Sequence, residues 1–180
     1  FGKIKLISHE QLKFLEANNF NPMRLFLDPI QINLTFLDKE YDFDQYSMVG
    51  LSGGGWITVV YSAIDERISN SFSVAGSMPF YLKVDERDIG DYEQTNIDLY
   101  RNVNYLELYI LSASGDGRKH TQIFNKNDPC CYPGNGYETY EFVIKDKISQ
   151  LGQGNFQIFV DNTHNEHKIS DVALDYIVKN

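Results

Sequence analysis

The sequence predicts an α/β protein, a three-layer sandwich in which helices cover both faces of a mainly parallel sheet. Short apolar runs with the length of buried strands alternate with longer segments whose apolar residues recur at helical spacing. A glycine-rich corner at positions 50–55 joins one such strand directly to a helix. The 180 residues, 42% of them hydrophobic and 14% aromatic, can bury one sizeable core, so residues 1–180 are expected to form a single domain.

The first half of the chain is expected to carry three helices and two strands. Two asparagines and a proline end the first helix, and Pro29 places the regular start of the second at or after itself, because a proline inside a helix lacks the N–H donor. The predicted elements are helix 9–17, helix 25–37, a strand at 46–51, a helix from the corner to Ile64 and a strand at 70–76.

In the second half, a near-continuous apolar run with the single charge Glu107 predicts a buried parallel strand at 105–113. A loop rich in glycine, asparagine, aspartate and proline is expected at 114–136. The other predicted elements are helices at 96–102, 137–151 and 169–178 and a last strand at 156–160. The aromatic segment 78–82 fits either the wall of a ligand pocket or a loop packed on the sheet.

The corner places a serine, Ser52, at the tip of a strand-to-helix turn with the pattern Gly-x-Ser-x-Gly. Such a turn lifts the hydroxyl clear of both elements and turns backbone N–H groups of the helix toward the same space, which is the geometry of a nucleophile elbow. We expect that a Cβ at Gly50 or Gly54 would collide with the neighbouring strand or helix.

Reactive side chains follow three of the predicted strands. Ser52 follows the first, Asp116 follows the strand at 105–113, and His164 and His167 follow the last strand. In parallel sheets ligands gather at the carboxyl ends of the strands, so these loops are expected to meet. A serine needs an imidazole to accept its proton, and the imidazole needs a carboxylate to fix its tautomer.

On these residues the chain resembles the α/β-hydrolase superfamily in its serine esterase, lipase and peptidase branches, over roughly Phe43 to Asn180. The resemblance implies that Ser52 is the nucleophile, Asp116 the orienting acid and His167 the base. It also implies that the backbone N–H of Gly53 supplies one half of the oxyanion hole. His167 is preferred over His164 because it directly precedes the last predicted helix.

Other assignments stay open among the polar residues of these loops. His164 is the alternative base, and Asp161 could cap the following turn or hold His164. Asp128, which precedes Pro129, is interpreted as a turn former. His120 could be a structural partner of Asp116.

The chain departs from the family pattern before the corner, where the residues read mainly as helices and no His-Gly-Gly loop supplies a second oxyanion donor. We therefore interpret the chain as the C-terminal part of a longer enzyme, with the early strands missing. A shortened sheet would otherwise expose an apolar strand edge.

The predicted function is hydrolysis of a small-molecule carboxylic ester through an acyl-enzyme intermediate, with no cofactor and no metal. The alternatives are a peptidase of the same fold and a non-catalytic interaction module. A third alternative is a redox protein that uses the adjacent thiols of Cys130 and Cys131. This alternative is weaker, because the two residues lack the usual Cys-x-x-Cys spacing. These two cysteines are interpreted as free thiols or an unusual loop clip.

The formal net charge of −9 argues against a nucleic-acid partner, and no apolar run reaches the length of a membrane span. Because the chain begins with Phe1, a leader could already have been removed. A soluble protein, cytoplasmic or secreted after processing, is expected, and the oligomeric state is left open.

Overall fold

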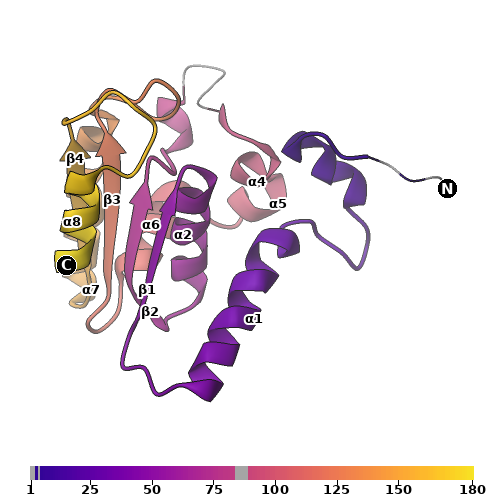
Figure 1. The fold of residues 1–180 in the computed structure, drawn as a ribbon, viewed down its shortest axis with the longest axis horizontal. Coiled ribbons are helices and arrows are strands. Elements are labelled where there is room, and N and C mark those ends of the chain that lie inside the picture. The colour runs from indigo at the N-terminus through magenta and orange to yellow at the C-terminus, as the bar shows by residue number, and fades with distance from the viewer. Residues whose placement is uncertain (1–2, 4, 84–88) are drawn as a thin grey trace.

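The computed structural model describes residue 3, residues 5–83 and residues 89–180. Its centre is a four-stranded parallel sheet with the strands in chain order, β1-β2-β3-β4 (Figure 1). Because all four strands run the same way, their carboxyl ends share one edge of the sheet, and the loops that follow them open onto that edge. The strands are β1 (Tyr46–Leu51), β2 (Ile68–Val74), β3 (Lys119–Asn125) and β4 (Asn155–Asp161).

Helices cover both faces of the sheet, as the three-layer prediction requires. On one face, three helices share a core that includes Trp56, Tyr109 and Ile144. On the other face, the last helix packs through Ala173 against Phe72 and Ile123. The three helices of the first face are α2 (Gly53–Ile64), α6 (Tyr105–Ala113) and α7 (Glu141–Leu151), and the last helix is α8 (Asp171–Lys179).

The remaining helices lie around this sandwich. Within the part of the chain that the structure describes, they are the 3-10 helices η1 (His9–Leu15), η2 (Phe80–Leu82) and η3 (Gly136–Thr139), together with α1 (Arg24–Glu40), α4 (Tyr92–Thr95) and α5 (Ile97–Tyr100). In Figure 1, α1 runs beside the β1 side of the sheet, where Leu34 packs against Ile68. Among the described residues, no helix combines the length and the apolarity needed to cross a membrane.

The predicted start of α1 at or after Pro29 is wrong, because the helix begins at Arg24 and contains the proline. The turn around Pro29 is held by packing: Leu27 and Ile30 contact the small core that Leu34 forms with Ile68. Tertiary burial therefore outweighs the local cost of the proline.

The segment predicted as a strand at 105–113 is the helix α6. Its start is fixed by a capping box, in which the Asn104 side chain accepts from the Glu107 N–H at 3.1 Å and the Glu107 carboxylate accepts from the Asn104 N–H at 2.8 Å. The run is almost continuously apolar because α6 packs between α2, α7 and the sheet, with Leu108 and Tyr109 buried. A helix buried in this way shows no amphipathic period.

The third strand lies instead inside the segment predicted as a loop. β3 carries polar side chains, His120 and Gln122, on the face that looks toward α6 and α7, and both are buried. Both make hydrogen bonds inside the protein: the Tyr140 hydroxyl donates to Gln122 Oε1 at 2.8 Å, and His120 Nδ1 lies 2.7 Å from Ser71 Oγ, whereas His120 Nε2 is buried without a hydrogen-bond partner. Because these buried side chains are polar, β3 lacks the continuous apolar run that usually indicates a central strand.

The aromatic segment 78–82 packs partly on the protein, while Phe80 and Tyr81 remain exposed. Met78 is buried against Phe124 and Tyr132. The ring of Phe80 makes edge contacts with Tyr100 and Tyr105, at centroid distances of 5.1 and 5.2 Å.

Candidate active site

Ser52 connects β1 to α2 in a backbone conformation that side chains rarely adopt, with φ 58° and ψ −123°. Two hydrogen bonds hold it there. The Ser52 N–H donates to the Val74 carbonyl at 2.9 Å, and the Ser52 carbonyl accepts from the Trp56 N–H at 2.9 Å. The corner is thus tied to the end of β2 on one side and to the first turn of α2 on the other.

The glycines of the corner have unequal roles. A Cβ at Gly50 would lie 2.0 Å from the Gly54 carbonyl oxygen, so the expected collision is confirmed there. The same expectation is wrong for Gly54, where a Cβ would meet nothing within 4 Å. The close approach is made one residue later: a Cβ at Gly55 would lie 2.7 Å from the Val74 carbonyl, and one at Gly76 would lie 2.4 Å from Gly55.

This difference gives a matched pair of substitutions. We expect Gly50→Ala to destabilise the protein by about 3 kcal/mol, because the added methyl meets backbone that cannot move aside. Gly54→Ala should leave the stability unchanged or raise it by up to about 1 kcal/mol, because the residue is helical and its Cβ has room. Urea denaturation of the two variants measures both effects, and an equal loss in both would contradict the geometry described for the corner.

The start of α2 presents backbone donors beside Ser52. The first N–H groups of a helix have no acceptor within the helix, and here they belong to Gly53 and Gly54. Both glycines are exposed, whereas Ser52 is half-buried. A Cβ at Gly53 would meet nothing within 4 Å, so the space beside this donor is open. The corner can therefore offer an N–H group to an anionic oxygen near the serine.

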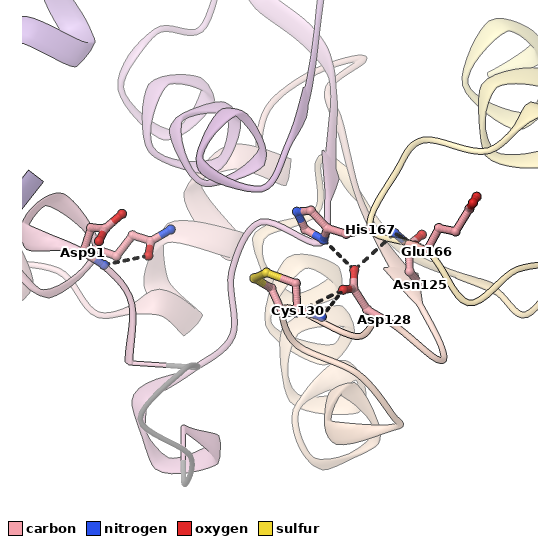
Figure 2. Close-up of a disulfide and its surroundings, with 8 residues drawn as sticks. Asp91, Asn125, Asp128, Cys130, Glu166 and His167 are labelled. Carbon is pink, nitrogen blue, oxygen red and sulfur yellow. Dashed lines mark hydrogen bonds and ion pairs between the residues drawn. A yellow bond between two sulfur atoms is a disulfide. The ribbon is translucent and has the colours of Figure 1, made fainter. Parts of the chain in front are cut away.

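Asp128, in the loop that follows β3, is buried and has hydrogen-bond donors at both carboxylate oxygens (Figure 2). Oδ1 accepts from the backbone N–H groups of Cys130 and Cys131, at 2.8 and 3.0 Å. Oδ2 lies 2.7 Å from His167 Nδ1. Burial alone would raise the pKa of this carboxyl, but the hydrogen bonds from His167 and the two amides outweigh it, so the pKa lies below its usual value.

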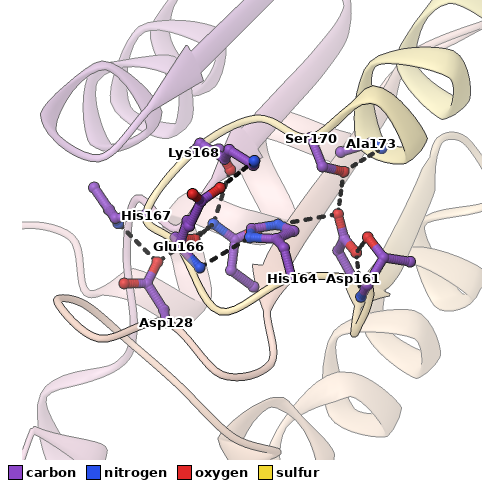
Figure 3. Close-up of polar contacts among 10 residues, drawn as sticks. Asp128, Asp161, His164, Glu166, His167, Lys168, Ser170 and Ala173 are labelled. Atoms are coloured by element: carbon purple, nitrogen blue, oxygen red, sulfur yellow. Dashed lines mark hydrogen bonds and ion pairs between the residues drawn. The ribbon is translucent and has the colours of Figure 1, made fainter.

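His167 reaches Asp128 from the loop that follows β4 (Figures 2 and 3). Its Nδ1 is occupied by the carboxylate, whereas its Nε2 is buried and has no hydrogen-bond partner. A carboxylate on Nδ1 fixes the tautomer that leaves Nε2 as an acceptor. The pair therefore presents one basic nitrogen at the carboxyl edge of the sheet.

The last residue of β3, Asn125, holds the two loops together. Its buried amide nitrogen donates to the Lys168 carbonyl at 2.9 Å and lies 3.5 Å from the Glu166 carbonyl. The same nitrogen lies 3.3 Å from Asp128 Oδ2. Asn125 therefore sets the position of the loop that carries His167 relative to Asp128, a role that sequence analysis did not assign to it.

His164 lies in the same loop but in a different environment (Figure 3). Its Nε2 is 3.3 Å from Asp161 Oδ2, and its Nδ1 accepts from the Glu166 N–H at 3.1 Å. Asp161 in turn accepts from the hydroxyl of Ser170, which caps α8, and from Thr163 at 2.6 Å. Asp161 therefore lies beside His164, as one sequence reading allowed, although the contact lacks hydrogen-bond geometry and His164 Nε2 is buried without a hydrogen-bond partner. His164 differs from His167 at Nδ1, which accepts from a backbone N–H and does not face a carboxylate.

Asp116 does not reach this edge of the sheet. It is exposed in the turn between α6 and β3, and it therefore precedes β3 rather than following a strand. That turn opens onto the amino edge, on the opposite side from Ser52 and His167. His120 is not its partner either, since it is fully buried within β3 beside Ser71. The structure thus joins His167 to Asp128, and not to the carboxylate that the sequence favoured.

Two clusters of described residues bring three metal-ligating atoms within 4.8 Å of one another. One contains His9, Asp91 and Glu93, near η1 and α4. The other contains Cys130, Cys131 and His167, at the candidate site. The two cysteines are joined by a disulfide, which is the loop clip among the two sequence interpretations.

Comparison with solved structures finds the same fold in several hydrolases. An acetyl xylan esterase from Paenibacillus sp. R4 superposes on 99% of this chain with 12% identity and a TM-score of 0.62, and 58% of that enzyme is covered. A Pyrococcus furiosus esterase matches 91% of this chain at 14% identity and a TM-score of 0.55, over 63% of its own length.

An acylaminoacyl peptidase from Pyrococcus horikoshii matches 84% of the chain at 15% identity, with a TM-score of 0.54. The match covers 26% of that peptidase, so the chain spans between about a quarter and three-fifths of the length of these three proteins. No protein-family model matches the sequence. A sequence search of curated proteins also found no match.

Proposed function

The chain has the α/β-hydrolase fold, and we propose that it is a serine hydrolase that cleaves a small-molecule carboxylic ester. In this proposal Ser52 is the nucleophile, His167 is the base and Asp128 is the acid that orients it. The observation that carries the proposal is the pair of Asp128 and His167, which leaves Nε2 unpartnered on the edge where the strained serine lies. Asp128 takes the place that the sequence assigned to Asp116.

In the first half-reaction, Ser52 Oγ attacks the ester carbonyl while its proton moves to His167 Nε2. The resulting oxyanion faces the N–H of Gly53 at the start of α2. Collapse of the tetrahedral intermediate expels the alcohol, which takes the proton from Nε2, and leaves an acyl-serine. Water then hydrolyses this ester through the same two steps.

Asp128 contributes by position and charge. Its carboxylate keeps the Nδ1 proton of His167 in place and stabilises the imidazolium that forms during each transfer. Because two amide groups and Asn125 share the carboxylate, its orientation does not depend on the histidine alone. Nε2 is free to accept, and catalytic hydrogen bonds often tighten only when substrate binds.

A fluorophosphonate probe tests the nucleophile directly. We expect the probe to label wild-type protein and the exposed-site control Asp116→Asn, and not to label Ser52→Ala. Mass spectrometry of the labelled protein should place the adduct on the peptide that contains Ser52. Equal labelling of wild type and Ser52→Ala would overturn the proposal.

A peptidase activity of the same site is the second candidate, favoured by the match to the acylaminoacyl peptidase. The same residues would form the acyl-serine, and the amine would leave with the proton from His167. Comparing kcat/KM for p-nitrophenyl acetate with that for an N-acyl-peptide p-nitroanilide separates the two. Turnover of the anilide alone would reassign the substrate class, and turnover of neither, with no labelling, would favour a non-catalytic module.

A further inference from the structure

The paired sulfurs of Cys130 and Cys131 lie against the histidine of the candidate site, as Figure 2 shows. One ligand atom from each cysteine and one ring nitrogen of His167 lie within 4.8 Å of one another. Cys130 is exposed and Cys131 is half-buried. The chain contains only these two cysteines, and the hydrolytic chemistry uses neither.

We propose that, once the Cys130–Cys131 disulfide is reduced, the two thiolates and the His167 imidazole bind one thiophilic metal ion such as Zn²⁺ or Cd²⁺. The bound ion occupies the ring nitrogen that accepts the serine proton. Metal binding by the three residues stands independently of the proposed hydrolase activity, whereas inhibition of turnover by the metal rests on it.

The donor set fits such an ion. Two thiolates and an imidazole are ligands that Zn²⁺ and other soft cations prefer, and three protein ligands leave a fourth position for water. With the usual Zn–S and Zn–N bond lengths, the donor atoms of a tetrahedral site stand about 3.5–3.8 Å apart. One ligand atom of each residue already lies within 4.8 Å of the other two, and binding requires the two sulfurs to separate.

The surroundings complete the site. Asp128 holds Nδ1 of His167, and a carboxylate on the second nitrogen of a ligating histidine orients the ring and raises its basicity. The nitrogen left for the metal is Nε2, which is buried and without a partner. The N–H groups of both cysteines bind the same carboxylate, so the ligands share one anchor. The net charge of −9 also favours the approach of cations.

Metal binding requires prior reduction of the disulfide. A dithiol or phosphine reductant transfers two electrons to the disulfide, which takes up two protons as the S–S bond breaks. The metal then displaces both thiol protons as it binds. In the oxidised protein neither sulfur is a thiolate, so the three-ligand site does not exist.

The experiment titrates Cd²⁺ into protein that has been reduced with a phosphine and desalted under anaerobic conditions. The thiolate-to-cadmium charge-transfer absorption reports binding through sulfur. We expect one Cd²⁺ per chain in reduced wild type and in reduced Ser52→Ala, and none in oxidised protein or in the double variant Cys130→Ser, Cys131→Ser. His167→Gln should bind at least about tenfold more weakly, and Asp128→Asn about 10–100-fold more weakly.

His164→Gln is the matched control, because this histidine lies in the same loop but outside the cluster, and it should bind Cd²⁺ as wild type does. Circular dichroism checks that each variant folds, and wild type alkylated at both cysteines replaces the serine variant if that variant does not. Absence of the absorption band in reduced wild type would overturn the site. Undiminished affinity in folded His167→Gln would overturn the role of the imidazole.

Inhibition of turnover by Cd²⁺ is measured in a separate experiment. In active, reduced enzyme Cd²⁺ should abolish turnover of p-nitrophenyl acetate, and a chelator should restore it, whereas the oxidised enzyme should be insensitive. If the protein shows no turnover at all, the proposed function fails while the absorption experiment still decides the metal site. Saturation with Cd²⁺ that leaves turnover unchanged would overturn the competition for Nε2.

Discussion

Asp128→Asn is expected to lower kcat for ester hydrolysis by about 10⁴-fold, whereas Asp116→Asn should change it by no more than about twofold. The reason lies in the hydrogen bonds of the carboxylate. Oδ1 accepts from the N–H groups of Cys130 and Cys131, so the asparagine oxygen will occupy that position and its NH₂ group will face His167. The imidazole must then accept at Nδ1 and carry its proton on Nε2, where it cannot accept one from the serine.

The two variants form a matched pair, because each replaces one carboxylate by an amide of the same shape. Steady-state kinetics with p-nitrophenyl acetate measures the effect, and circular dichroism confirms that both variants are folded. The opposite ranking, with Asp116→Asn inactive and Asp128→Asn active, would mean that His167 is oriented by some other group during turnover.

Acidification from pH 6.5 to pH 5 should reduce the free energy of unfolding by roughly 2 kcal/mol through His120 alone. Burial, and then the charge of Arg118, lower the pKa of His120 from 6.5 to about 3 in the folded protein. Below pH 6.5 the unfolded chain binds a proton that the folded protein excludes, so stability falls as the pH falls. The loss grows until the pH reaches the folded pKa, where it is on the order of 5 kcal/mol.

Urea denaturation at several pH values, with wild type and His120→Gln compared, measures this contribution. Glutamine is neutral throughout, so the variant should lack the part of the slope between pH 6.5 and pH 5 that His120 contributes, whatever its absolute stability. His9 titrates in the opposite sense, because its hydrogen bond to Glu93 raises its pKa, but it is present in both proteins and cancels in the difference. Parallel pH profiles would show that His120 is protonated in the folded state.

The corner and its flanking elements could be predicted because their signal is local. The β1 strand, the α2 helix and the serine with positive φ between them follow from glycines that a tight turn requires. Even so, the motif alone placed one close contact at Gly54, whereas the structure places it at Gly55, against Gly76. Gly76 lies 21 positions after Gly55 in the sequence, and no local pattern reports such a contact.

The prediction of Asp116 as the partner of His167 followed from one misplaced strand. With a strand at 105–113, the first carboxylate beyond it is Asp116; with the observed strand at Lys119–Asn125, the first carboxylate beyond it is Asp128. The α6 helix has the continuous apolar run that usually indicates a buried strand, because a helix that is buried on most sides shows no helical period in its apolar residues. The β3 strand has polar side chains, because hydrogen bonds inside the protein allow them to be buried. The capping pair of Asn104 and Glu107 was the one local sign of a helix.

The loop that carries His167 is held in its middle as well as at its ends, because Asn125 at the end of β3 binds the carbonyls on either side of His167. The proposed nucleophile, acid and base follow β1, β3 and β4, and the proposed base comes last in the chain. A ribosome would release the serine and the acid well before it releases their partner. A product that stops before β4 would therefore carry the proposed nucleophile without the proposed base, and we expect it to be inactive.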